Sequence, residues 1–328
     1  MILNVSRGSS IIFFVLFLMP LILASKSYFY GRGHYVFLNR SNIQALQGGS
    51  MILILIQCAI EQLSNADSIL RAISGLGDIA SAIFLFLTGY ELVRLAMKNR
   101  QKIRGMMIQK MGALLLVLLG GNLLLGLVLI YLGEHIHLIE ILTSTFKFQF
   151  VNGIEVSFIA VLFYFYLVIL ISYHLRFLWM ASLLFSGLCY LQDWSLMMPF
   201  YVLGGAVLAT YPRYAFLILK RHSLNLTLIL GILMMVCFRL KVSYWMPWIG
   251  IVGSMIMLMK VQFKSTFFSL ISRLAIPLYG VYLPVLYLVF YSSEPRSSFL
   301  VVLSLAISVV LVIGIKSRIG YFYNRWGL

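Results

Sequence analysis

The densest group of charged side chains lies between positions 94 and 110. It consists of Arg94, Lys98, Arg100, Lys102, Arg104 and Lys110. Guanidinium and ammonium groups form charge-assisted hydrogen bonds with phosphates, so this run could hold a diphosphate. Positive residues also anchor membrane helices on the cytoplasmic side, and that second role fits the same run. The candidate residues for binding a phosphorylated donor are Arg100, Lys102, Arg104 and Lys110.

Polar side chains interrupt several otherwise apolar runs. They are Gln44, Gln47, Gln57 and Cys58 in the run that begins near position 42, Asp78 and Thr88 in the next, and Asn122 and Glu155 further on. Polar residues inside a bilayer are costly, which makes each of them a candidate for function. For Asp78 and Glu155 we favour a place at the outer interface over an ion pair within the membrane.

A second group of titratable residues follows position 132. Glu134, His135, His137 and Glu140 could bind a metal ion or handle protons. Two histidines at i and i+2 do not share a helix face, however, and no HExxH-type spacing occurs. We therefore expect a solvated outer loop and no metal site.

Composition defines the environment that holds these residues. The 328 residues are 62% hydrophobic and only 10% charged, whereas about a quarter of residues are charged in soluble domains. Without water in the bilayer core, the backbone must satisfy its hydrogen bonds within helices, which predicts an all-α polytopic membrane bundle. The alternating segments of a membrane β-barrel are absent from the sequence. Cys58, Cys189 and Cys237 lie in apolar runs, which is typical of small hydrophobic residues rather than disulfides.

The distribution of positive charge predicts how the bundle is oriented. Apolar runs fall at about 9–25, 44–61, 73–96, 107–132, 153–172, 177–191, 196–219, 223–240, 244–262, 267–291 and 298–316. Counted over alternate loops, 19 of the 25 Lys and Arg lie on one side. This split predicts eleven spans with the N-terminus outside and the C-terminus in the cytoplasm. The net charge of +16 thus reflects topology, and we expect no nucleic-acid partner.

The first apolar run has two interpretations. Residues 9–25 could be a cleaved signal sequence, but the basic residues that follow favour a retained helix. We therefore divide the chain into an N-terminal helix with its basic loop, residues 1–41, and a transmembrane domain, residues 42–328.

The order of several motifs resembles acyltransferase family 3, whose members are membrane proteins that acylate carbohydrates. The motif-bearing segments are NIQALQGGSMILILIQC at 42–58, GLGDIASAIFLFLTGYEL at 75–92, KIRGMMIQK at 102–110, VSFI at 156–159, YVLGGAVLATY at 201–211 and ISRLAIPLYGVYLPVLYL at 271–288. The resemblance covers roughly residues 42–316. It implies ten spans with both ends inside, so that the first helix of this chain is an extra one.

The residues at the catalytic positions of that family differ here. Where the resemblance implies Asp, Arg and His on the first helix of the domain, this chain has Gln44, Gln47 and Cys58. The His expected near the end is replaced by Tyr282. An amide cannot act as a general base for a sugar hydroxyl, and an ordinary phenol is a poor one near neutral pH. Cys58 could accept an acyl group as a thioester.

The resemblance implies a function in the modification of cell-surface polysaccharide or glycolipid at the plasma or inner membrane. An active protein would transfer an acyl group from acyl-CoA to a carbohydrate hydroxyl, with the basic run holding the diphosphate of the donor. The first alternative is a catalytically silent relative that binds lipid-linked glycan or a glycan synthase subunit among membrane lipids. The second is a glycan or lipid transporter, which would require broken helices at mid-depth.

Overall fold

The computed structural model describes residues 27–29, 38–61, 68–98, 103–153, 157–175, 197–212, 246–291 and 303–314, with short stretches between 217 and 233. This part of the chain is almost entirely helical, which confirms the predicted all-α class. The exception is a two-stranded antiparallel ribbon, β1 (Ser27–Phe29) with β2 (Val261–Phe263). The sequence did not predict this pairing, which joins the predicted N-terminal segment to the end of the helix before β2.

Four described helices are long and apolar enough to cross a membrane. They are α3 (Arg40–Glu61), α4 (Ser68–Lys98), α5 (Ile103–Tyr131) and α12 (Thr266–Tyr291). Their bounds lie within a few residues of the predicted runs, and such helices fit a membrane protein.

The remaining predicted spans have a different outcome. Four of them correspond to shorter helices, namely α7 (Ser157–Leu175), α9 (Met197–Thr210), α11 (Met246–Lys260) and the helix Leu303–Gly314. The predicted runs at 9–25 and 177–191, and most of 223–240, lie outside the described residues. The described helices therefore support a multi-pass bundle without establishing eleven spans.

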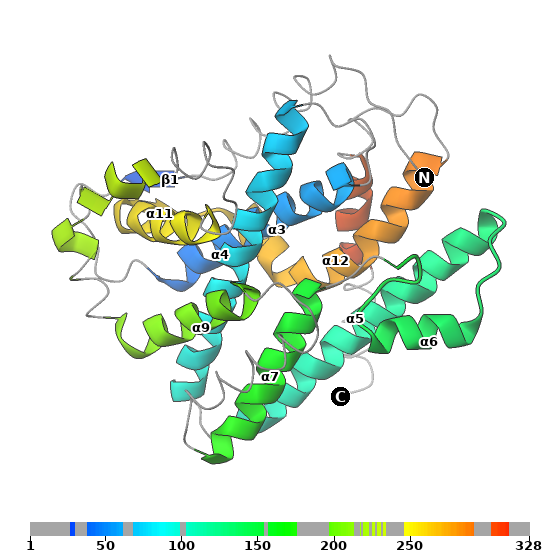
Figure 1. Ribbon diagram of the computed structural model, residues 1–328, viewed down its shortest axis with the longest axis horizontal. Coiled ribbons are helices and arrows are strands. Elements are labelled where there is room, and N and C mark those ends of the chain that lie inside the picture. The colour runs from blue at the N-terminus through cyan, green and yellow to red at the C-terminus, as the bar shows by residue number, and fades with distance from the viewer. Residues whose placement is uncertain are drawn as a thin grey trace.

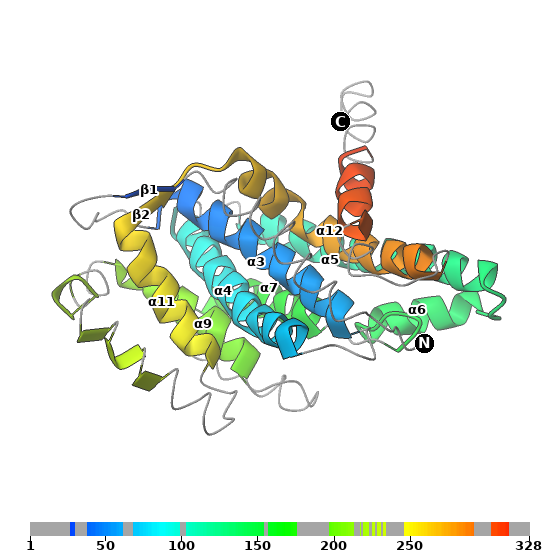
Figure 2. The same cartoon turned by 90° about the horizontal axis from the view of Figure 1, so that it is seen from above.

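Helices α3 and α4 form the centre of the bundle, as Figures 1 and 2 show. Helix α12 packs on α3, whereas α9 and α11 pack on α4. Helix α5 lies along α12, and α7 packs on α5. In lipid, helices approach each other closely where small residues lie between them, and in this bundle those residues are glycines. A Cβ at Gly48 would collide with the backbone of Phe268 on α12, and one at Gly205 of α9 would collide with the backbone of Phe86 on α4.

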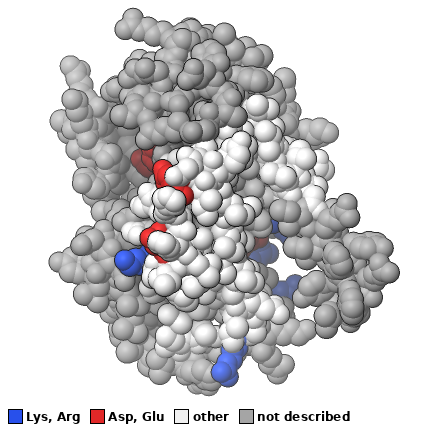
Figure 3. Space-filling view, turned by 90° about the vertical axis from the view of Figure 1, so that its right-hand side faces the viewer, with Lys and Arg blue, Asp and Glu red and all other residues white. Residues whose placement is uncertain are grey.

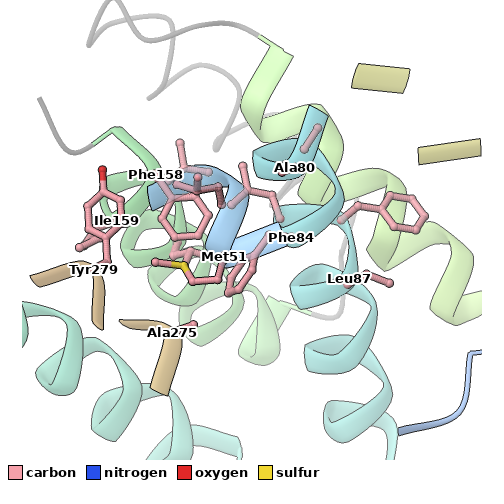
Figure 4. Close-up of a cluster of buried hydrophobic side chains, with 14 of the residues drawn as sticks. Met51, Ala80, Phe84, Leu87, Phe158, Ile159, Ala275 and Tyr279 are labelled. Atoms are coloured by element: carbon pink, nitrogen blue, oxygen red, sulfur yellow. The ribbon is translucent and has the colours of Figure 1, made fainter. Parts of the chain in front are cut away.

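The buried core is apolar and aromatic where α3, α4, α7 and α12 meet. Figure 4 labels eight of its side chains, Met51, Ala80, Phe84, Leu87, Phe158, Ile159, Ala275 and Tyr279. The Phe158 ring lies 5.0 Å from that of Phe84 and 5.9 Å from that of Tyr279, measured between ring centroids. In lipid, the hydrophobic effect does not drive helices together, so their association depends on close packing. Aromatic contacts of this kind contribute to that packing.

Helix α12 changes direction along its length in both ribbon views. Pro277 and Pro284 lie inside it, and a proline in a helix removes a backbone hydrogen bond and produces a bend. Between them, Gly280 approaches α5 closely, because a Cβ on Gly121 would lie 2.6 Å from the Gly280 carbonyl oxygen. The two prolines thus shape α12, and the paired glycines bring it against α5.

The segment predicted as an outer loop contains a further helix, α6 (Leu138–Phe146). It packs on α5 in the part of the bundle at the right of Figure 1. The prediction of a loop after position 132 is therefore wrong at Leu138–Phe146, which form a helix. The helix buries Ile141 and Thr145.

Candidate functional site

Gln44 and Gln47 connect α3 to α12. Ser269 donates a hydrogen bond from Oγ to Gln44 Oε1 at 2.8 Å, and Ser272 donates one to Gln47 Oε1 at 3.1 Å. These two glutamines are three residues apart and so lie on the same side of α3, as do the two serines on α12. The side-chain amides of Gln44 and Gln47, at the positions where the resemblance implies Asp and Arg, therefore make helix-to-helix contacts.

Gln47 also reaches α4. Its Nε2 donates to Thr88 Oγ1 at 3.4 Å, while the Thr88 hydroxyl donates to the Phe84 carbonyl at 2.8 Å. One turn further along α4, the half-buried carboxylate of Glu91 interacts with the Gln47 amide. Gln47 is thus the point at which α3, α4 and α12 share one polar network.

Helices α5 and α7 complete this network. The Lys110 ammonium lies 5.5 Å from the centroid of the buried Tyr166 ring, at a distance suited to a cation–π interaction. Lys110 also interacts electrostatically with Glu91, as do Arg40 and Arg94. One carboxylate on α4 thus interacts with cations of α3, α4 and α5, and Arg94 also donates a hydrogen bond to the Leu38 carbonyl at 3.2 Å. We call the group formed by Gln47, Thr88, Glu91, Lys110 and Tyr166 the inner polar cluster.

The predicted diphosphate-binding residues fall into three situations. Lys110 belongs to the inner polar cluster, where it interacts electrostatically with Glu91 and lies over the Tyr166 ring. Arg104 is exposed at the start of α5. Arg100 and Lys102 lie outside the described residues.

Cys58 and Tyr282, at the positions where the resemblance implies histidines, lie toward the opposite end of α3 and α12. Cys58 Sγ is 3.9 Å from the hydroxyl of Tyr279, which lies one turn before Tyr282. Tyr282 is 1% exposed, and its hydroxyl has no hydrogen bond of ordinary geometry within the described residues, although it lies near Ser304. Cys58 and Tyr282 are thus neighbours, but no imidazole accompanies them in the described part of the chain.

Gln57 links two carboxylates at the same end of the bundle. Its Nε2 donates to Glu61 Oε1 at 2.9 Å and to Asp78 Oδ1 at 2.8 Å. Asp78 is exposed, and the hydrogen bond from Gln57 connects it to α3. Its place at the outer interface stays a prediction. Glu155 lies outside the described residues.

The turn between α5 and α6 and the start of α6 hold four further titratable residues. Glu134, His135, His137 and Glu140 are all exposed. Glu140 accepts a hydrogen bond from the His137 backbone N–H at 3.3 Å, which stabilises the start of α6. Among the described residues, no group of three His, Cys, Asp or Glu could hold a metal ion.

Sequence reasoning did not identify Glu91, Tyr166, Ser269 or Ser272. A usable signal existed for Glu91, because a carboxylate within the apolar run FLFLTGYELV is unusual. The two serines and Tyr166 carry no comparable signal. Their role follows only from the packing of α7 and α12.

Comparison with known proteins finds no match. No family model matches the chain, and neither the curated proteins nor the solved structures contain a detectable relative. The resemblance to acyltransferase family 3 therefore rests on the motifs alone.

Proposed function

We propose that this chain is an acyltransferase-3-like integral membrane protein of surface polysaccharide or glycolipid modification. In this proposal it binds acyl-CoA and a lipid-linked glycan or a glycan synthase subunit, without transferring the acyl group itself. The observation that carries the proposal is the pair of hydrogen bonds from Ser269 and Ser272 to Gln44 and Gln47. Amides that bridge helices keep a bundle together but cannot remove a proton from a sugar hydroxyl.

The basic end of the bundle supports the donor-binding part of the proposal. Arg104 is exposed and lies about 1.7 turns before Lys110, so both side chains belong to the same end of α5. With Arg40 and Arg94 near Glu91, this end has more cations than carboxylates among its described residues. Such an excess favours a diphosphate, which arginine can bind in a bidentate manner.

Binding and transfer are measured separately on the purified full-length protein. Labelled acyl-CoA binding is followed first, and transfer of the label to total surface glycan second. We expect binding without transfer. Arg104→Ala should weaken binding by about tenfold, the effect of losing one charge-assisted contact, whereas Arg221→Ala, also exposed, should not. If Arg104→Ala and the parent protein bind acyl-CoA with equal affinity, Arg104 does not contact the donor. If the parent protein transfers the label to glycan, the protein is an active enzyme.

Acyl transfer through Cys58 is the second candidate, because Cys58 is the one cysteine among the described residues and is half-buried on α3. The thiolate would attack the acyl carbonyl and release CoA as its thiol, and a glycan hydroxyl would then attack the thioester and regenerate Cys58. Intact-mass analysis after incubation with acyl-CoA distinguishes the two candidates. A covalent acyl adduct that disappears in Cys58→Ala supports transfer, and an unmodified mass supports binding alone.

A further inference from the structure

Helix α6 folds back along the outer half of α5. A Cβ on Gly126 would touch the Ile141 side chain, and Asn122 Nδ2 donates to Thr145 Oγ1 at 2.9 Å. The two helices therefore run antiparallel, with the end of α6 near Asn122. Asn122 precedes Tyr131 by nine residues, or about 14 Å along the helix axis. The end of α6 thus lies near the middle of the apolar stretch of α5, well inside the span Arg104–Tyr131.

Beyond α6, the chain is irregular at this depth, and its backbone groups find protein partners. Asn122 is fully buried, donates to the Gln149 carbonyl at 3.0 Å and accepts from the Val151 N–H at 3.0 Å. Asn152 donates to the Tyr287 hydroxyl on α12 at 2.9 Å. Irregular backbone inside a bilayer requires such partners or a water-filled cavity. The hydrogen bonds of Asn122 meet that requirement for Gln149 and Val151.

Helix α7 then continues toward the basic end. The Phe148 ring packs on Phe163 and Tyr164 of α7, with ring centroids 5.2 and 5.8 Å apart. Further along α7, Tyr166 lies beneath Lys110 of α5. Helix α6, the irregular segment and α7 thus descend along α5 one after the other, as a single crossing interrupted near its middle.

The exposed surface of α6 divides into two stripes. One is apolar, with Ile139, Leu142 and Phe146 exposed by 73%, 41% and 74%. The other is polar and consists of the exposed residues Glu140, Thr143 and Lys147, the last directly after the helix. Each stripe follows the i, i+3, i+7 spacing of one helix face. Ile141 and Thr145 form the third face, against α5.

The two stripes require different surroundings. Lys147 lies at the deep end of α6, and a charged side chain at that depth faces water or the protein interior rather than lipid. Over the same depth, α5 exposes the apolar side chains of Leu123, Leu127 and Ile130. The apolar stripe of α6 is therefore compatible with contact with the hydrocarbon tails of membrane lipids, and the polar stripe is not.

We propose that α6 is a membrane-embedded half-helix with lipid on its apolar stripe and a water-filled path on its polar stripe. The path leads from the outer turn past Glu140 to Lys147. This inference does not depend on acyl-CoA binding, because it concerns the opposite half of α5.

Cysteine accessibility tests the proposal in the full-length protein in sealed membranes. Cys58, Cys189 and Cys237 are first replaced by Ala, and single cysteines are then introduced at Thr143, Lys147, Leu142 and Phe146. The probe is an anionic, membrane-impermeant thiol reagent, and His135→Cys in the outer turn serves as the accessible control. We expect Thr143→Cys and Lys147→Cys to react at least about tenfold faster than Leu142→Cys and Phe146→Cys, because lipid excludes the charged reagent.

Two outcomes would overturn the proposal. Reaction at all four positions as fast as at His135→Cys would mean that α6 lies in water, and no reaction at any of them would mean that no aqueous path exists. If the cysteine-free protein does not fold, Phe146→Trp and Thr143→Trp in the native sequence are compared in bilayers of brominated lipid. Additional quenching for Phe146→Trp alone supports the proposal, and equal quenching contradicts it.

Discussion

Phe148 adopts a backbone conformation that favours glycine. Its φ is 52°, and it follows the end of α6. The N–H of Gln149 donates to the Ser144 carbonyl at 2.9 Å, and that of Phe148 donates to the Thr145 carbonyl at 3.2 Å. This pair of hydrogen bonds is the helix ending in which a left-handed residue, usually Gly, follows the last turn. Phe148 is buried, with 7% of the residue exposed, and its ring packs on α7, which offsets the cost of the left-handed conformation.

A pair of substitutions at Phe148 separates these two effects. Phe148→Ala and Phe148→Gly both remove the ring, which should cost about 3 kcal/mol. Only Gly also relieves the left-handed conformation, so we expect Phe148→Gly to be more stable than Phe148→Ala by about 1 kcal/mol. Thermal unfolding in detergent measures the difference. The usual order inside a helix, with Ala more stable than Gly, would contradict the assigned role of this residue.

Two glycines allow the close packing of α4 against α9. A Cβ at Gly205 of α9 would collide with the Phe86 carbonyl and approach the Tyr90 N–H, and one at Gly89 of α4 would collide with the Val202 carbonyl. Backbone atoms cannot move aside as a flexible side chain can. The helices themselves would have to separate.

Substitution of Gly205 tests this contact between α9 and α4. Gly205→Ala should lower stability by about 2 kcal/mol, as overpacking of a close contact does. The matched control is Gly253→Ala on α11, where a Cβ has no neighbour within 4 Å. The control should be neutral or stabilising by up to about 1 kcal/mol, because Ala is the better helix former. Both unfolding temperatures are measured in the same detergent, and equal losses would exclude the close contact as the cause.

The sequence predicts the elements of this protein better than their contacts. Helices α3, α4, α5 and α12 follow long apolar runs, and their ends fall close to the predicted positions. Helix α6 was missed because nine residues with polar neighbours resemble a loop. The hydrogen bonds of Gln44 and Gln47 to α12 join residues more than 200 positions apart. No local pattern encodes such a contact, so the inner polar cluster emerges only from the packed bundle.

Charge is segregated between the two ends of the described bundle. Arg94 and Lys98 close α4, and Arg104 begins α5, so these cations gather at one end. Exposed carboxylates gather at the other, where Glu61 ends α3 and Glu134 follows α5. Figure 3 faces the side of the molecule that carries the turn between α5 and α6. Most described atoms there are uncharged, Asp and Glu form a small group, and a few Lys and Arg side chains also lie on this face.

This segregation predicts the orientation of α5 in the membrane. The basic end belongs in the cytoplasm by the positive-inside rule, which places Gly105 inside and His135 outside. Gly105→Cys is a suitable probe because it is exposed, retains every charge and has no neighbour within 4 Å of an added Cβ. In the cysteine-free protein in intact cells, an impermeant maleimide should label His135→Cys. Gly105→Cys should react only after permeabilisation. The reverse pattern would invert the bundle and place Arg104 and Lys110 on the side that lacks cytoplasmic acyl-CoA, so the same experiment also constrains the proposed donor contact.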